Sequence, residues 1–184
     1  MRARVTGGIM MLALVALSGC SAPATSNDTA ASASTQAESK GTGFNAADAC
    51  AILPGDKVSA AFGEVVSGAE LGMVAPGTAE TAAFSQCTYR FASGAMVTFF
   101  ARQSPVPDNT TEAMQRTKDA LVDNLGATIE PVPGLGKDAF WTDQMNQLHV
   151  FIGEDRYIFF TSMKPPAGSK PREAMMTLAK SLAG

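Results

Sequence analysis

The sequence has little of what most metal-binding and nucleic-acid-binding sites need. Among 184 residues it contains one histidine, three cysteines and one tryptophan, and its formal net charge is only −3. A single histidine without a CxxC pair argues against a closed zinc site, which takes four Cys, His or acidic ligands. Without a basic excess there is no electrostatic footprint for nucleic acid, so we expect no nucleic-acid partner.

A long hydrophobic run is missing as well. Residues 7–17, "GGIMMLALVAL", form an uncharged stretch that follows Arg2 and Arg4. About 20 apolar residues are needed to cross a bilayer, so this stretch is too short for a transmembrane helix. A basic start and a short apolar core are instead typical of a secretory signal peptide.

The apolar core ends in Leu17-Ser18-Gly19-Cys20. This ending resembles a bacterial lipobox, which implies a signal peptide over residues 1–19 and palmitate-type acylation of Cys20. The alternative is an ordinary signal peptide with an incidental cysteine. Because one acyl chain anchors a protein only marginally, a stable anchor needs several, and the resemblance implies them. Ser21, rather than Asp, in the next position resembles a sorting signal for the periplasmic face of the outer membrane, if the host is Gram-negative.

The composition changes after Cys20. Residues 21–43 contain no Val, Ile, Leu, Met or aromatic residue. Such a segment cannot bury enough apolar surface to offset the entropy of ordering it. We therefore predict the lipidated cysteine and a flexible tether over residues 20–43, followed by one globular domain over residues 44–184, a usual size for a single domain.

Within this domain, periodicity and turn residues predict both helices and strands. Helices are expected over residues 45–63, where Pro54 opens a second segment, over 108–126 and over 171–184. Strands are expected over residues 84–92, 95–102, 138–143, 147–153 and 156–163. Short turns between strands favour an antiparallel sheet with helices packed on it, an α+β fold. In the helix over 108–126, Asn109 and Glu112 predict a capping box and Gly126 the end.

Two cysteines remain once Cys20 takes the lipid. In an oxidising compartment we expect Cys50 and Cys87 to form a disulfide. A disulfide between them closes a loop of nearly forty residues, which stabilises a domain by roughly 4 kcal/mol in the chain-entropy model. A redox or metal-binding pair is the alternative, which the wide spacing and the single histidine disfavour.

Residues 132–141, "VPGLGKDAFW", have the Gly-x-Gly-x-x-Ala spacing of a dinucleotide-binding loop. Such a loop needs a central strand before it and a helix that starts inside it. Pro131 and Pro133 are not tolerated in a central strand, and Phe140 and Trp141 favour a strand rather than a helix after the glycines. We interpret the stretch as a turn that enters a strand, and we expect no nucleotide cofactor.

The arrangement of cysteines, turn and strands resembles a group of bacterial envelope lipoproteins of unknown function. The resemblance is carried by "DACAILPGDKVSAAFG" at 48–63, "CTY" at 87–89, and "VPGLGKDAFW" ahead of "LHVFIGEDRYIFF". Proteins of this group have a single domain that begins with a cysteine-bearing helix and carries a second cysteine before an aromatic residue. The resemblance implies the disulfide and the fold type, and it brings no catalytic residues with it.

Aromatic side chains concentrate in the last strands. His149 shares a strand face with Phe151, because successive side chains on a strand alternate between its faces. If the second face of the sheet is uncovered, an exposed patch there is a candidate binding surface for a protein partner or an apolar ligand. The residues assigned to this surface are Trp141, His149, Phe151 and Tyr157. The alternative is that residues 64–83 or the C-terminal helix cover that face.

Catalytic groupings are not evident. Ser-His-Asp catalysis requires His149, yet no Gly-x-Ser-x-Gly elbow accompanies it. Asp138 and Asp143 are explained as solvated acids at strand ends rather than as a carboxylate pair. Met145 and His149 offer a thioether and an imidazole to a soft metal such as Cu(I), although methionine at such spacing is more often a core filler. We expect no enzyme activity, no metal and no cofactor.

These observations predict a non-catalytic, lipid-anchored lipoprotein of the cell envelope that binds an envelope protein or polymer. The alternative is a periplasmic carrier of a small apolar ligand or soft metal, which the aromatic strands and the methionines favour. A hydrolase is a third hypothesis, which rests only on His149 and scattered acidic residues.

Overall fold

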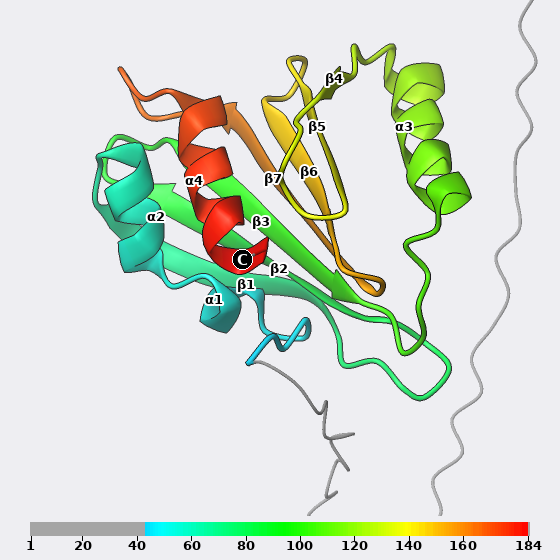
Figure 1. Cartoon of the computed structure of the whole chain (residues 1–184). Coiled ribbons are helices and arrows are strands. Elements are labelled where there is room, and N and C mark those ends of the chain that lie inside the picture. The colour runs from blue at the N-terminus through cyan, green and yellow to red at the C-terminus, as the bar shows by residue number, and fades with distance from the viewer. Residues whose placement is uncertain (1–42, 184) are drawn as a thin grey trace, which may run out of the picture. The chain divides into compact units, whose positions relative to one another are not determined.

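The computed structural model describes residues 43–183, which form an antiparallel sheet of seven strands with helices on both faces (Figure 1). The predicted signal peptide, Cys20 and the predicted tether up to residue 42 lie outside the described residues. The elements are α1 (Ala49–Ile52), α2 (Gly55–Phe62), β1 (Val66–Ala75), β2 (Ala83–Phe91), β3 (Met96–Gln103), α3 (Thr111–Leu125), β4 (Glu130–Pro131), β5 (Asp138–Thr142), β6 (Gln147–Ile152), β7 (Arg156–Lys164) and α4 (Pro171–Ala183). The α+β fold and the antiparallel sheet are confirmed, and the sheet is the dominant part.

The strands lie in the order β1-β2-β3-β7-β6-β5-β4. Two antiparallel meanders therefore meet where β3 pairs with β7. The helices α1, α2 and α4 cover one face of this sheet, and Figure 1 shows α2 and α4 side by side in front of it. We call this the helix-covered face. The helix α3 packs on the opposite face, which we call the α3 face.

The helix-covered face holds the main hydrophobic core. A row of directly paired residues crosses it and is at most 2% exposed: Trp141, Leu148, Phe160, Phe99 and Cys87. The disulfide between Cys50 and Cys87 is confirmed, and it ties α1 to the middle of β2. Beside it, the buried hydroxyl of Tyr89 donates to the carbonyl of Leu53, where α1 ends.

The first turn of α3 differs from the prediction. The N-cap is Thr110, whose hydroxyl accepts from the backbone N–H of Ala113 at 3.1 Å, so the capping box with Asn109 and Glu112 is wrong. Asn109 is 3% exposed, and its side chain donates instead to the carbonyls of Gly153 and Arg156. A tertiary contact has therefore displaced the local cap by one residue.

The interpretation of residues 132–141 as a turn that enters a strand is confirmed. The element that begins at Asp138 is the strand β5 and not a helix, and Pro131 lies in the short edge strand β4. Gly136 adopts a positive φ of 63°, and a Cβ atom there would collide with the carbonyl oxygen of Phe151. Gly136 therefore serves a close approach of the turn to β6, and Gly134 serves a positive φ of 77°, which explains both glycines without a nucleotide.

The segment over residues 64–83 contains β1, an edge strand that pairs with β2 only. Its register with β2 is interrupted twice, and Met73 has a positive φ of 49° next to the second interruption. Leu71, Met73 and Val74 are 41–62% exposed. Lying at the sheet edge, this segment does not line the pocket between α3 and the strands β6 and β7.

Candidate functional site

The α3 face contains a pocket of about 660 Å³ between α3 and the strands β6 and β7. It is open to solvent on one side, and its size lies in the range of small-molecule sites. Most of the side chains around it are apolar. Its walls are formed by Ala113, Arg116, Thr117, Ala120, Leu121, Asn124 and Leu125 of α3, and by Met145, Gln147, His149, Tyr157 and Phe159 of the sheet side.

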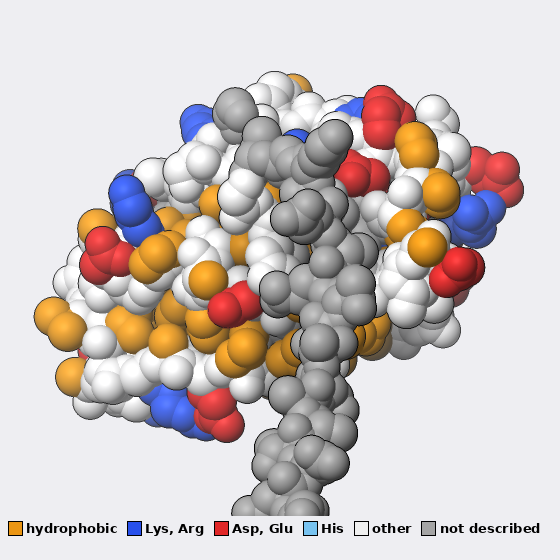
Figure 2. Space-filling view, turned by 90° about the horizontal axis from the view of Figure 1, so that it is seen from below, with side chains coloured by type: hydrophobic (Ala, Val, Ile, Leu, Met, Phe, Trp, Pro, Cys, Tyr) orange, Lys and Arg blue, Asp and Glu red, His pale blue; other side chains and the backbone are white. Residues whose placement is uncertain are grey.

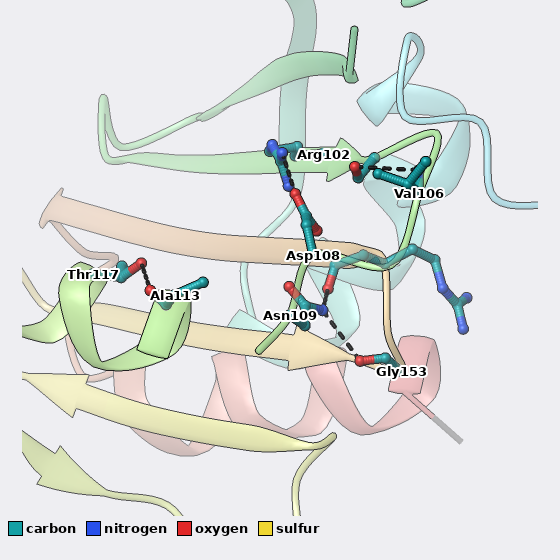
Figure 3. A network of polar contacts seen from close by, with 9 residues as sticks. Arg102, Val106, Asp108, Asn109, Ala113, Thr117 and Gly153 are labelled. Carbon is teal, nitrogen blue, oxygen red and sulfur yellow. Dashed lines mark hydrogen bonds and ion pairs between the residues drawn. The ribbon is translucent and has the colours of Figure 1, made fainter. Parts of the chain in front are cut away.

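The start of α3 is fixed on the turn between β6 and β7. The backbone N–H groups of Asp108 and Asn109 both donate to the carbonyl of Glu154, at 2.8 and 2.9 Å. Figure 3 shows the side chain of Asn109 directed toward Gly153 and that of Asp108 toward Arg102. The Arg102–Asp108 ion pair has an N–O distance of 2.5 Å and is about one-third exposed. Backbone and side-chain contacts thus hold the first turn of the helix in place.

The rest of α3 has fewer contacts with the sheet. Met114 packs against Phe140 and Phe151, and Leu121 lies at the margin of the same cluster. Lys118 forms a half-buried ion pair with Asp138 of β5, with an N–O distance of 2.6 Å. Beyond this point the apolar side of the helix leaves the sheet, so that Leu125 is 48% exposed. After Leu125, the side chain of Gln144 in the turn between β5 and β6 donates to the carbonyl of Gly126, the C-cap of α3, at 2.9 Å. The helix is therefore attached at several points along its length, and the pocket lies where its side chains do not close onto the sheet.

The sheet side of the pocket is built from stacked rings. Phe140, His149, Phe159 and Phe100 are directly paired across β5, β6, β7 and β3 and form what we call the aromatic row. The His149 ring lies almost parallel to that of Phe140, with centroids 4.5 Å apart and an angle of 9° between the planes. Its centroid is 5.4 Å from that of Phe159. The row is buried under α3 at Phe140 and becomes partly exposed at Phe159 and Phe100.

His149 is 4% exposed and has a hydrogen bond at each ring nitrogen. Its Nδ1 lies 2.6 Å from the hydroxyl of Tyr157, and its Nε2 lies 3.2 Å from Oε1 of Gln147. Burial lowers the pKa of His149 to about 4. Burial also raises the pKa of the Tyr157 hydroxyl above its ordinary value, while the nearby charge of Arg102 opposes that rise. At neutral pH the pocket therefore contains a neutral imidazole and a neutral phenol.

The structure brings together three of the four residues assigned to a binding surface. His149, Phe151 and Tyr157 lie on the α3 face, where Phe151 and Tyr157 have ring centroids 4.8 Å apart. His149 and Tyr157 line the pocket, whereas Phe151 is 5% exposed beneath Met114.

The fourth residue, Trp141, does not belong to this surface. It is 2% exposed on the helix-covered face, where Arg172 of α4 lies over its ring and Asp143 accepts from its Nε1. The pairing of Trp141 with Leu148 places it on the side opposite to its neighbour Phe140. The prediction that Trp141 belongs to an exposed patch is therefore wrong. The face that carries His149, Phe151 and Tyr157 is covered in part by α3, and not by residues 64–83 or α4.

The local geometry disfavours two chemistries considered from the sequence. Met145 and His149 both line the pocket, but a metal ion on His149 would have to displace either Tyr157 or Gln147. Within residues 43–183, no group of three or more His, Cys, Asp or Glu side chains is placed to hold a metal ion. As a general base, His149 is weak at neutral pH because burial lowers its pKa.

Gln147 and Phe159 are pocket residues that the sequence analysis did not identify. The alternation that pairs His149 with Phe151 also places Gln147, two residues earlier, on the same face. For Phe159, the same alternation starting from Tyr157 was a sufficient signal. The contribution of α3 could not be found in this way, because nothing in a single sequence tells which sheet face a helix covers.

The visible surface carries no extended field of one charge. In Figure 2, hydrophobic side chains gather in a broad area of the described part, while acidic and basic side chains lie singly or in small groups of both signs. No helix within residues 43–183 is long and apolar enough to cross a membrane.

The predicted relation to envelope lipoproteins rests on the motifs named above. Comparison with known proteins adds no relative: the chain matches no protein-family model, and it matches neither a curated protein nor a solved structure at a significant level.

Proposed function

We propose that this protein is a non-catalytic, lipid-anchored lipoprotein of the cell envelope whose domain binds a small apolar molecule in the pocket beneath α3. The observation that carries the proposal is the pocket itself, about 660 Å³ in volume and walled mainly by apolar and aromatic side chains. A cavity with an apolar lining and a few convergent polar groups is the usual form of a small-molecule site. In this proposal, the lipid on Cys20 keeps the domain close to the membrane.

Binding rather than catalysis is supported by the state of the polar groups. His149 makes hydrogen bonds to Tyr157 and Gln147, and none to a serine or a carboxylate within the described residues. Its lowered pKa keeps it neutral and weakly basic at neutral pH. Such a group orients a ligand better than it abstracts a proton.

The test is the binding of an uncharged naphthalene fluorophore to the chain from residue 21 onward, which retains every described residue. Leu121 lines the pocket, whereas the adjacent Val122 is 44% exposed and does not. We expect Leu121→Arg to weaken binding at least tenfold, because a charged side chain would occupy an apolar site. The matched variant Val122→Arg should bind as the unaltered chain does. Circular dichroism and the melting temperature control for folding.

A saturable signal that survives Leu121→Arg would place the probe elsewhere on the molecule. Absence of binding to the unaltered chain would contradict the proposal that the pocket binds a small apolar molecule. A bound ligand should also raise the melting temperature as its concentration exceeds the dissociation constant. This provides a measurement that does not depend on fluorescence.

A second candidate function is the binding of a protein strand along β1. The observation that favours it is an edge strand of ten residues, Val66–Ala75, with exposed Leu71, Met73 and Val74. An open edge offers unpaired backbone groups to an added strand. The two register interruptions and the positive φ of Met73 count against it, since bulges protect edges from such pairing. Crosslinking from Leu71 in cells, with Val122 as the control position, would test it.

A further inference from the structure

The polar groups of the pocket form an ordered chain whose directions follow from elementary acid–base chemistry. A phenol hydroxyl is a stronger donor than a neutral imidazole N–H, and the 2.6 Å contact between Tyr157 and Nδ1 of His149 suits an O–H···N bond. Nδ1 is then the acceptor, so the proton of the neutral ring is on Nε2. That N–H donates to Oε1 of Gln147 at 3.2 Å.

This chain fixes the orientation of the Gln147 side chain. With Oε1 used by His149, the amide nitrogen Nε2 is left as the outward end. Gln147 is 7% exposed and lines the pocket, and within residues 43–183 no hydrogen bond from its Nε2 is found. Nε2 is also not fully enclosed, because Asp108 Oδ1 is the one fully enclosed side-chain atom without a partner among the described residues. The amide N–H groups therefore face the open volume of the pocket, where an acceptor can approach them.

The charges around the pocket bear on the ligand as well. Arg116 is the one charged side chain among the lining residues. It stands at the solvent side with 65% of its side chain exposed, and it already forms an ion pair with Glu112 at 2.6 Å. At the inner end, Gln147, His149 and Tyr157 are all neutral. A carboxylate bound there would lose its hydration, and Arg102, the cation whose charge acts on Tyr157, is already paired with Asp108.

We propose that the ligand is an uncharged, largely apolar molecule with a carbonyl oxygen, which accepts a hydrogen bond from Nε2 of Gln147. Its apolar body lies between Leu121 of α3 and Phe159 of β7, which line opposite walls. The proposal rests on the proposed function and deepens it, since it names the class of ligand and assigns Gln147 as the residue that selects it. An amide donor in an apolar site discriminates because a ligand without an acceptor leaves it unpaired.

Three probes with one ring system separate the contributions. Acetylnaphthalene has a carbonyl acceptor, ethylnaphthalene has none, and naphthoate carries a negative charge. We expect the chain from residue 21 onward to bind the ketone roughly three- to tenfold more tightly than the hydrocarbon, the range of one net hydrogen bond. Naphthoate should bind more weakly than the ketone.

Two substitutions at Gln147 test the assignment. Gln147→Met removes the donor at similar size, and Gln147→Glu removes it while retaining an acceptor for Nε2 of His149. Both should abolish the preference for the ketone over the hydrocarbon. Unchanged hydrocarbon affinity in Gln147→Met, together with an unchanged melting temperature, shows that the pocket itself is intact in that variant.

The outcomes distinguish this inference from the proposed function. Equal binding of ketone and hydrocarbon by the unaltered chain would overturn the role of Gln147 and leave the apolar pocket standing. Tightest binding of naphthoate would overturn the uncharged class and point to Arg116. If none of the three probes binds, the proposed function fails, and the inference fails with it.

Discussion

The two faces of the sheet use the same kinds of residue for different ends. On the helix-covered face, Phe99 and Phe160 have ring centroids 4.9 Å apart and are fully buried. Directly behind them on the α3 face, Phe100 and Phe159 have the same centroid distance of 4.9 Å, yet both are only partly buried. Equal pairing on the same two strands therefore coexists with unequal covering. We infer that the first face supplies stability and that the second is kept accessible.

The covering differs because the helices are attached differently. The disulfide ties α1 to β2, and α2 and α4 pack on each other as well as on the sheet. In contrast, α3 contains no cysteine, and within residues 43–183 its buried side packs on the sheet and not on a helix, with Leu125 near its end 48% exposed. Regions with few apolar contacts open at low free energy, which suits a site that a ligand must enter.

The largest expected effect contrasts neighbouring residues of β7. Phe160→Ala removes a fully buried ring and should lower the free energy of unfolding by about 3–5 kcal/mol. Phe159→Ala removes a partly exposed ring at the pocket and should lower the free energy of unfolding by less than Phe160→Ala does, because less buried surface is lost. Urea unfolding followed by the fluorescence of the buried Trp141 measures both.

Binding of the naphthalene probe should show the reverse order. Phe159→Ala weakens binding, while Phe160→Ala, studied where it is still folded, leaves the affinity nearly unchanged. Equal losses of stability at the two positions would mean that the faces are not divided as we infer.

This division could be predicted only in part. Alternation along the strands was enough to place Phe140 and Trp141 on opposite faces, and His149 with Phe151. It did not reveal that Trp141 belongs with Leu148, because the face that one strand shares with another depends on their pairing register. The four-residue turn between β5 and β6 sets that register. A shift of the pairing by one residue would place each side chain on the other face of the sheet.

The helix α3 illustrates a second limit of sequence reasoning. Apolar residues recur along it at helical spacing, among them Met114, Leu121 and Leu125, and this stripe predicts one buried side. In the structure Met114 is 7% exposed and Leu125 is 48% exposed, so the two ends of one stripe have different roles. Periodicity reports that a side is apolar. Whether the sheet or a ligand covers it depends on the angle at which the helix is held.

A smaller effect is expected from pH, and it acts through the α3 face alone. The pKa of His149 is about 4 in the folded domain, against about 6.5 in an unfolded chain. Between these values the unfolded chain binds a proton that the folded domain does not. The free energy of unfolding should therefore fall as the pH is lowered from about 6.5 to about 4, by up to about 3 kcal/mol, and this contribution should level off below that range.

Carboxylates also titrate in this range, so the comparison with His149→Gln isolates the histidine. The difference in unfolding free energy between the unaltered chain and the variant should depend on pH between about 4 and 6.5 and be constant at neutral pH and above. Parallel pH profiles for the two chains would show that His149 is not held neutral in the folded state.

The smallest effect concerns the ion pair that holds the middle of α3. Lys118 and Asp138 are 20% and 27% exposed, so solvent screens their attraction and Asp138→Asn should cost at most about 1 kcal/mol. If α3 opens separately from the core, the amides of α3 in Asp138→Asn should exchange hydrogen up to about fivefold faster, while the exchange of β2 and β3 amides is unaffected.

Glu112→Gln is the matched control, because the Arg116–Glu112 pair on the same helix is mostly exposed and should contribute little. Equal acceleration in α3 and in the central strands would show that the helix opens only when the whole domain unfolds, and the two faces would then differ in covering but not in local stability.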